Sequence, residues 1–191
     1  MTTHRILALA GLALATVAAC VGAEEWAGTR ETPARADTVV RIASYNVLNL
    51  FDDVDDPSLE GDADDCHSRD KTVRAKPVEQ NEAAARAIRE IDADVVALQE
   101  IESFDALIKF REEHLRGLGY DHVASVDVGY HRGVEQSVIS RFPIKDVRVW
   151  PGAELGGVHP ELWNGRPNRF AGDTLRWRRS PLMVTVEVPA G

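Results

Sequence analysis

Apolar and polar residues follow one another along positions 39–188 in a pattern that predicts strands and helices in turn, followed by several strands in series. The β-branched stretch 39–47 predicts a buried strand, and 94–99 (DVVALQ) predicts a second one. Between them, Pro77 can begin a helix, because a first-turn residue needs no N–H partner, and this helix runs to about Glu90. Its apolar side chains share one face (Ala84, Ala87, Ile88 and Ile91). This order of elements is typical of a layered α/β domain.

A second helix is predicted after the second strand, where the Ser103 hydroxyl can cap the first turn. Gly117 or Gly119 is expected to end this helix, because glycine accepts the left-handed backbone of a C-terminal cap. The side chains expected to face inward are Phe104, Leu107, Ile108 and Leu115.

The second half of the chain predicts strands without further helices. Their expected ranges are 120–127, 136–140, 146–150 and 182–188, the last with a clean alternation of apolar and polar residues. Residues 151–173 are rich in glycine, proline, asparagine and tryptophan and are predicted to form one long loop. Loops of this length are usually functional or disordered.

The first 23 residues read as a signal peptide. Arg5 supplies a positive start, and residues 6–19 form an uncharged apolar run, too short for a membrane-spanning helix of about 20 residues. The stretch Val17-Ala18-Ala19-Cys20 resembles a bacterial lipobox, which predicts a lipidated Cys20 as the first mature residue. Cleavage after Ala23, giving a free secreted protein, and a buried N-terminal helix are the alternatives.

Residues 24–38 are polar and lack periodicity, so they are predicted to be a linker, with the folded domain spanning 39–191. The signal peptide predicts export, either as a membrane-anchored lipoprotein of the bacterial cell envelope or as a secreted protein.

Composition excludes several classes of protein. The 191 residues are 44% hydrophobic and 28% charged, which rules out a disordered chain, a collagen and a polytopic membrane protein. The formal net charge is −9, so the overall field does not attract nucleic acid or anionic lipid. A phosphate would need a metal ion or a local arginine, and residues 141–191 are locally basic, with eight arginines and lysines against five acids.

An acidic segment follows the first predicted strand. Residues 52–65 hold eight carboxylates and no basic residue. They fail the calcium-loop template because no glycine stands at the required sixth place. A solvated loop is therefore favoured over a metal site.

Polar residues close the first two predicted strands, Asn46 in the first and Glu100 in the second. If these strands are parallel neighbours, their carboxyl ends meet at one edge of the sheet, where ligands bind in open α/β sheets. A carboxylate and an amide oxygen suit Mg²⁺ or Mn²⁺. The alternative is that Glu100 caps the next turn and Asn46 hydrogen-bonds the loop.

Two more charged residues precede strands. Arg179 comes before Ser180-Pro181, and an arginine at such a place can present two parallel N–H donors to a phosphate. Glu135 comes before the strand QSVISR. For Arg179 an ordinary surface charge, and for Glu135 a charge on the rim, is the alternative.

Four strings in order carry a family resemblance: RIASYNVLNLFD, ADVVALQEIE, RGVEQSVISRFPI and RRSPLMVTVEV. They resemble the endonuclease/exonuclease/phosphatase superfamily with the deoxyribonuclease-I-like fold, over about residues 39–188. The resemblance implies a Mg²⁺-dependent phosphohydrolase, with Mn²⁺ as a second candidate ion. It implies that Glu100 binds the metal directly, that Asn46 helps to hold the metal and a phosphate oxygen, and that Arg179 contacts the substrate phosphate. Glu135 falls in an acidic position that orients a catalytic histidine or contacts substrate.

The sequence also departs from the family pattern. It contains neither Gly-Asp-x-Asn nor Ser-Asp-His, and its histidines, at positions 4, 67, 114, 122, 131 and 159, lie in no matching context. The resemblance therefore implies the N-terminal half of a four-layer α/β/β/α sandwich, with the C-terminal half absent and hydrolysis weak or lost. Such a chain is expected to be unstable unless another chain completes it, because the apolar residues of 182–188 would lack a partner layer and the last strand would be a bare edge.

Three functions follow as hypotheses. An exported nuclease-like phosphodiester hydrolase is favoured, and a phospholipid or sugar-phosphate esterase is the runner-up. Trp150, Trp163 and Trp177 could form an apolar rim for the esterase or stack on bases for the nuclease. The third is a non-catalytic binding or surface protein that keeps the fold.

Overall fold

The computed structural model describes residues 31–34, 36, 39–54, 75–130 and 132–189. The predicted signal peptide with Cys20, much of the predicted linker and most of the acidic segment 52–65 lie outside these residues. The described residues after Glu31 belong to one compact unit, Thr32–Gly191.

A four-stranded mixed sheet forms the centre of this unit, in the order β1-β2-β4-β3. Its strands are β1 (Ile42–Leu50), β2 (Val95–Ile101), β3 (His122–Ser125) and β4 (Glu135–Ser140). The first two are parallel neighbours, which is the condition under which their carboxyl ends share one edge, whereas β4 runs antiparallel to β2 and β3. The expectation that the first strand is buried is wrong. It lies at the edge of the sheet, so Ile42 is 72% exposed while Val47 and Leu50 are buried.

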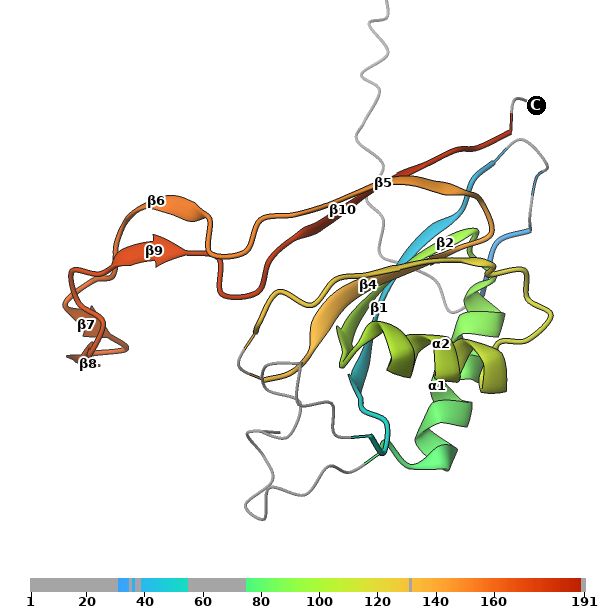
Figure 1. Ribbon diagram of the computed structural model, residues 1–191, viewed down its shortest axis with the longest axis horizontal. Coiled ribbons are helices and arrows are strands. Elements are labelled where there is room, and N and C mark those ends of the chain that lie inside the picture. Colours follow the sequence, from blue (N-terminus) through green and yellow to red (C-terminus); the bar gives the residue numbers. More distant parts are fainter. Residues whose placement is uncertain (1–30, 35, 37–38, 55–74, 131, 190–191) are drawn as a thin grey trace, which may run out of the picture. The chain divides into compact units, whose positions relative to one another are not determined.

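Two helices cover one face of the sheet, α1 (Val78–Ile91) and α2 (Phe104–His114) (Figure 1). Ile88 of α1 and Leu107 of α2 are fully buried against Leu98 of β2. The predicted cap is confirmed, since the Ser103 hydroxyl accepts a hydrogen bond from the Ala106 amide at 3.0 Å. Each buried leucine or isoleucine of this kind contributes roughly 1.5–3 kcal/mol to the free energy of unfolding.

Phe104 does not face inward as predicted, because it is 47% exposed. The buried residues of α2 are Ala106, Leu107 and Phe110. Since each residue turns the helix by about 100°, Phe104 lies about 100° around the helix from the centre of this buried face.

The other face of the sheet carries an antiparallel pair of strands, β5 (Ile144–Val149) and β10 (Leu182–Val186). Leu182, Val184 and their neighbours pack against Val95, Ala124 and Val138 of the sheet. The expectation that the last strand lacks a partner layer is therefore wrong. The described residues thus form three layers, which are the helices, the mixed sheet and the β5–β10 pair, and the fourth layer of the sandwich stays a prediction.

Residues 151–173 do not form the single loop that their composition predicts. They contain β6 (Glu154–Val158), which pairs with β9 (Thr174–Arg176), and β7 (Leu162–Trp163), which pairs with β8 (Arg166–Pro167). Asn164 and Gly165 join β7 to β8 with positive φ angles of 50° and 75°. These angles fit a type I′ turn, the connection that suits the twist of a two-residue hairpin.

The end of the predicted linker makes contacts with the folded unit. The Thr32 hydroxyl donates a hydrogen bond to the Glu90 carbonyl at 2.7 Å, and the Arg41 guanidinium donates one to the Pro33 carbonyl at 2.8 Å. The folded unit therefore reaches to Thr32, before the expected start at Val39. No helix in the described part of the chain is long and apolar enough to cross a membrane.

Candidate functional site

The site begins at a bulge near the carboxyl end of β2. Gln99 pairs with Gln136 of β4 and Ile101 pairs with Glu135, so Glu100 is an extra residue between them. Its φ of +67° lies in the left-handed region, where a residue with a side chain is strained by about 1–3 kcal/mol. The extra residue lets Ile101 return to the helix-covered core while Glu100 leaves it. Strain of this kind, held by well-packed neighbours, is common at functional sites.

Two guanidiniums lie next to the Glu100 carboxylate, which is only 12% exposed, and a buried lysine interacts with it electrostatically. The Arg132 and Arg179 guanidiniums each lie 3.8 Å from its Oε1 atom. No hydrogen-bond donor within the described residues reaches this carboxylate. Its lone pairs are therefore available to a ligand.

Lys76 is the third cation and lies just before α1. It is 8% exposed, and its Nζ donates hydrogen bonds to the Leu48 carbonyl at 2.6 Å and to Gln80 at 3.3 Å. Burial lowers the pKa of Lys76, while the negative charge of Glu100 acts to raise it. A buried ammonium of this kind is a preorganised partner for an anion.

Asn46 lies beside the bulge, because its backbone pairs with Gln99 across the parallel ladder. Its side chain accepts a hydrogen bond from the Leu48 amide at 2.8 Å, which is the local loop contact that the sequence left open. The described contacts therefore bring Glu100 and Arg179 together and place Asn46 next to them in register.

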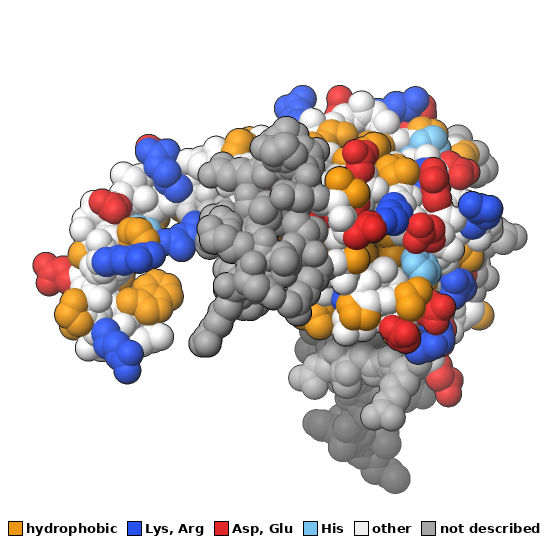
Figure 2. Space-filling view, turned by 60° about the horizontal axis from the view of Figure 1, so that its bottom comes forward, with side chains coloured by type: hydrophobic (Ala, Val, Ile, Leu, Met, Phe, Trp, Pro, Cys, Tyr) orange, Lys and Arg blue, Asp and Glu red, His pale blue; other side chains and the backbone are white. Residues whose placement is uncertain are grey.

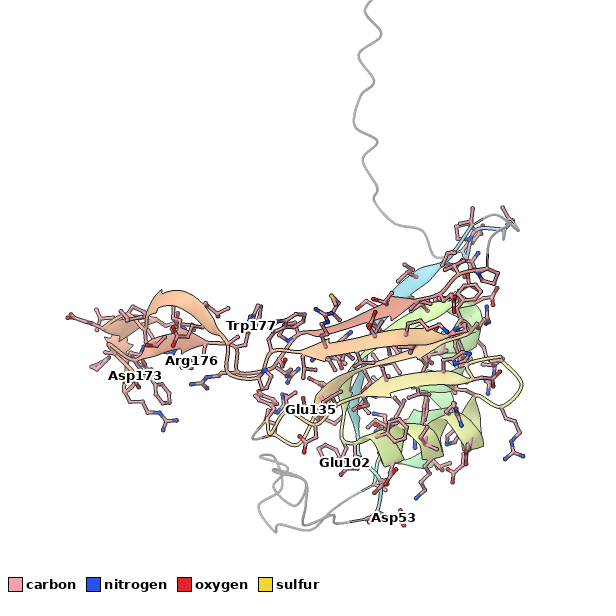
Figure 3. The ribbon with its side chains drawn as sticks, turned by 45° about the horizontal axis from the view of Figure 1, so that its top comes forward. Asp53, Glu102, Glu135, Asp173, Arg176 and Trp177 are labelled. Atoms are coloured by element: carbon pink, nitrogen blue, oxygen red, sulfur yellow. The ribbon has the colours of Figure 1, made fainter. Side chains whose placement is uncertain are left out.

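Glu135 is buried, with 2% of its surface exposed, so it is not a charge on the rim (Figure 3). Its carboxyl oxygen accepts hydrogen bonds from the Val128 and Tyr130 amides, both at 3.3 Å. Burial raises the pKa of Glu135 from its usual 4.5 to about 7, against the lowering effect of these two amides, and Asp127 adds to the rise. This carboxyl group therefore holds the loop before β4 in place.

That loop supports Arg179. The Arg179 guanidinium lies 4.8 Å from the centre of the Tyr130 ring, a cation–π distance. On the other side of the chain, the Ser180 hydroxyl accepts a hydrogen bond from the Trp150 amide at 2.7 Å and is itself buried. The Tyr130 ring therefore packs against the Arg179 guanidinium, and the Ser180 hydrogen bond anchors the backbone next to it.

Sequence reasoning did not identify Lys76, Tyr130 or Arg132 as site residues. Arg132 stands three residues before Glu135, at the start of the RGVEQ string, which is the signal that could have marked it. Lys76 directly precedes the proline that begins α1, but a single lysine there carries no pattern.

The described residues contain no group of three or more histidine, cysteine, aspartate or glutamate side chains placed to hold a metal ion. The donor set is instead one carboxylate with an amide nearby, surrounded by cations. Such a set can bind a cation through Glu100 and an anion through the basic side chains, which is the combination that a metal-bound phosphate presents.

Comparison with protein families identifies a relationship over most of the chain. The model described as Endonuclease/Exonuclease/phosphatase family matches residues 43–187. Searches against curated proteins and against solved structures give no match. The matched range covers most of the chain. It includes all of the site residues named above: Asn46, Lys76, Glu100, Arg132, Glu135 and Arg179. The chain therefore belongs to the endonuclease/exonuclease/phosphatase family, whose members are typically hydrolases acting on phosphoester bonds.

Proposed function

We propose that this chain is a Mg²⁺-dependent phosphodiester hydrolase of the nuclease type. The observation that carries the proposal is the Glu100 carboxylate, which is almost buried, has no hydrogen-bond donor among the described residues, and lies between Arg132 and Arg179. A carboxylate that served only the fold would be expected to accept hydrogen bonds at such burial.

The donor set fits a hard divalent ion. Mg²⁺ keeps several waters and takes one or two carboxylates together with substrate phosphate, so the Glu100 carboxylate suffices as its charged protein ligand. The Asn46 amide oxygen, beside it in register, has a second lone pair after its bond to Leu48. Mn²⁺ prefers the same oxygen donors. When bound, the ion would polarise a phosphoryl oxygen and neutralise charge that develops on it.

The basic side chains would hold the phosphate itself. Three cations against one carboxylate leave a surplus of positive charge at the site, and each guanidinium can form two parallel bonds to phosphate oxygens. At 3.8 Å a pair of unit charges interacts by about 4 kcal/mol at an effective dielectric constant of about 20. Arg132 and Arg179 would therefore stabilise charge on the phosphoryl group in the transition state.

Glu135 and Tyr130 would act indirectly, as positioning residues. Glu135 fixes the Tyr130 backbone through its amide, and the Tyr130 ring lies against Arg179. Holding a guanidinium in place before the substrate arrives lowers the reorganisation that the reaction requires.

Metal binding tests the proposal directly. We expect the chain to bind Mn²⁺, detected by the loss of the free-ion electron paramagnetic resonance signal, and Mg²⁺ to compete for the same site. Glu100→Gln should abolish this binding. Glu112→Gln is the matched control, because Glu112 is an exposed helix carboxylate, and it should bind as the unchanged chain does. Equal Mn²⁺ binding by the Glu100 variant would overturn the proposal.

Hydrolysis tests the reaction class. We expect EDTA-sensitive cleavage of bis(p-nitrophenyl) phosphate and nicking of plasmid DNA, both exceeding the cleavage of p-nitrophenyl phosphate. Arg179→Lys should lower kcat/KM by about 10–100-fold, because a lysine cannot form the bidentate contact. Preference for the monoester would instead identify a phosphatase, and metal binding without any turnover would identify a binding protein that keeps the fold.

We also propose that the protein is exported, as a lipoprotein anchored through Cys20 or as a secreted protein. The support is the sequence of residues 1–23. The mass of the mature N-terminus from bacterial cells tests it. A diacylated Cys20 is expected, a start at Glu24 would indicate free secretion, and an intact Met1 would overturn the proposal.

A further inference from the structure

A concave surface lies within residues 153–178, which contain β6, β7, β8 and β9 and are called the hairpin segment below. It encloses about 700 Å³, a volume within the range of about 300–1,000 Å³ that holds small ligands. Its lining is mainly aromatic and arginine side chains, including Trp163, Phe170, Arg166, Arg169, Arg176 and Arg178.

Phe170 lies at the centre of these contacts. The guanidiniums of Arg169 and Arg178 lie 4.5 Å and 5.0 Å from the centre of its ring. The His159 ring lies 5.8 Å away at a tilt of 39°. These contacts hold flat, cationic groups next to a flat, apolar one.

The positive charge here is largely uncompensated. Within the described part of the chain, Arg176 pairs with Glu154, whereas Arg166, Arg169 and Arg178 form no ion pair with a carboxylate. The segment has four arginines, no lysine and three acids in a chain whose net charge is −9. Figure 2 shows basic and hydrophobic side chains next to one another over this segment. The local surface therefore favours an anion although the whole protein does not.

Large apolar side chains are exposed in the same place. Trp163 is 62% exposed and Leu162 is 58% exposed, on the strand that precedes the Asn164-Gly165 turn. Exposed aromatic rings beside arginines are the two elements of single-strand nucleic-acid binding, in which bases stack on rings and guanidiniums contact phosphates.

We propose that the hairpin segment 153–178 binds single-stranded nucleic acid. The proposal names the substrate class of the hydrolase proposed above and rests on that function for its catalytic meaning. The covalent link supports the connection, because Arg178 of this surface directly precedes Arg179, which contacts Glu100.

A lipid surface is the competing ligand, and the observations disfavour it. Trp163 pairs across the β7–β8 hairpin with Arg166, so the exposed apolar residues are interleaved with charge and do not form a continuous apolar tip. A membrane-inserted surface would also not require a cavity with two guanidiniums placed over one ring.

Fluorescence anisotropy with a labelled oligothymidylate tests the proposal, using the full chain with EDTA present to prevent cleavage. Binding should weaken as salt rises. Trp163→Ala and Phe170→Ala should each weaken it by about tenfold, as expected for the loss of one stacked base. Arg169→Ala should weaken it and reduce the slope of log K against log salt by about 0.7. Arg148→Ala, which removes the same charge from the exposed face of β5, is the control and should have a much smaller effect.

The outcomes separate this proposal from the hydrolase proposal. Trp163→Ala should keep Mn²⁺ binding and hydrolysis of bis(p-nitrophenyl) phosphate, whereas Glu100→Gln should keep oligonucleotide binding. Far-UV circular dichroism checks that each variant folds. No binding at low salt, equal binding by the Arg148 and Arg169 variants, or binding to phosphatidylglycerol vesicles in place of the oligonucleotide would overturn the proposal.

Discussion

The Glu100 site and the hairpin segment 153–178 both combine arginines with aromatic rings, but they differ in burial. At the site, Glu135 and Lys76 are 2% and 8% exposed, and the Glu100 backbone is strained within a packed ladder. In the segment, Leu162 and Trp163 are more than half exposed, and the strands pair only in twos. Substitutions at the site should therefore change stability as well as chemistry, whereas substitutions in the segment should change recognition alone.

The largest expected contrast compares leucines in the two regions. Leu98 is fully buried below the site, so Leu98→Ala should lower the free energy of unfolding by about 2–5 kcal/mol through lost burial and the cavity left behind. Leu162→Ala in the segment should change it by no more than about 0.5 kcal/mol. Urea unfolding followed by circular dichroism measures both. Similar losses would contradict the contrast.

The buried carboxyl of Glu135 should make stability depend on pH. Because its pKa is raised from 4.5 to about 7, the folded state binds the proton more tightly than the unfolded state. The free energy of unfolding should therefore fall as pH rises from about 4.5 to 7, by at most about 3 kcal/mol. Thermal unfolding of Glu135→Gln across this range should show a smaller fall, and parallel curves for the two proteins would refute this assignment.

Ser180 lies at the boundary between the two regions, and its removal tests how firmly they are joined. Ser180→Ala leaves the Trp150 amide without its hydroxyl acceptor and should lower the free energy of unfolding by about 1–2 kcal/mol. Ser44→Ala, at an exposed position of β1, should cost less than about 0.5 kcal/mol. Denaturant titration compares the two, and an equal effect would mean that the Trp150 contact adds nothing.

The smallest expected effect is a difference in stability between glycine and alanine that has opposite signs at two positions. Glycine accepts a positive φ, so Glu100→Gly should be more stable than Glu100→Ala by about 1 kcal/mol while both lose metal binding. In helix α2 the same comparison at Glu112 should reverse, with glycine less stable than alanine by about 1 kcal/mol. Denaturant unfolding of the four variants gives the answer. If Glu100→Gly were less stable than Glu100→Ala, the backbone at position 100 would not be strained.

Regular periodicity made the layered core predictable. The presence of β1, β2 and both helices, together with the Ser103 cap, follows from apolar spacing and local hydrogen-bonding chemistry. The bulge at Glu100 does not, because it depends on register with strands on both sides. The edge position of β1 depends on strand order, which apolar spacing does not encode.

The site and the hairpin segment were predictable only in part. Glu100 and Arg179 stand next to strands and could be singled out, but Lys76 and Arg132 lie in loops that only the fold brings to Glu100. The burial of Glu135 depends on a loop that folds back over it. In residues 151–173, abundant glycine and proline suggested a loop, although Asn164-Gly165 is a strong hairpin signal that composition obscured.

The bond between Trp150 and Ser180 joins the two ends of everything inserted between β5 and β10. Closing a loop costs only about 0.6 kcal/mol more for each doubling of its length. The residues between Trp150 and Ser180 can therefore be lengthened, shortened or replaced with little loss of stability. Arg179 lies between the hairpin segment and Ser180, so the Trp150–Ser180 bond holds its backbone independently of the inserted residues. The segment between β5 and β10 can therefore be exchanged while the core and Arg179 stay unchanged, which makes it a practical position for grafting foreign hairpins.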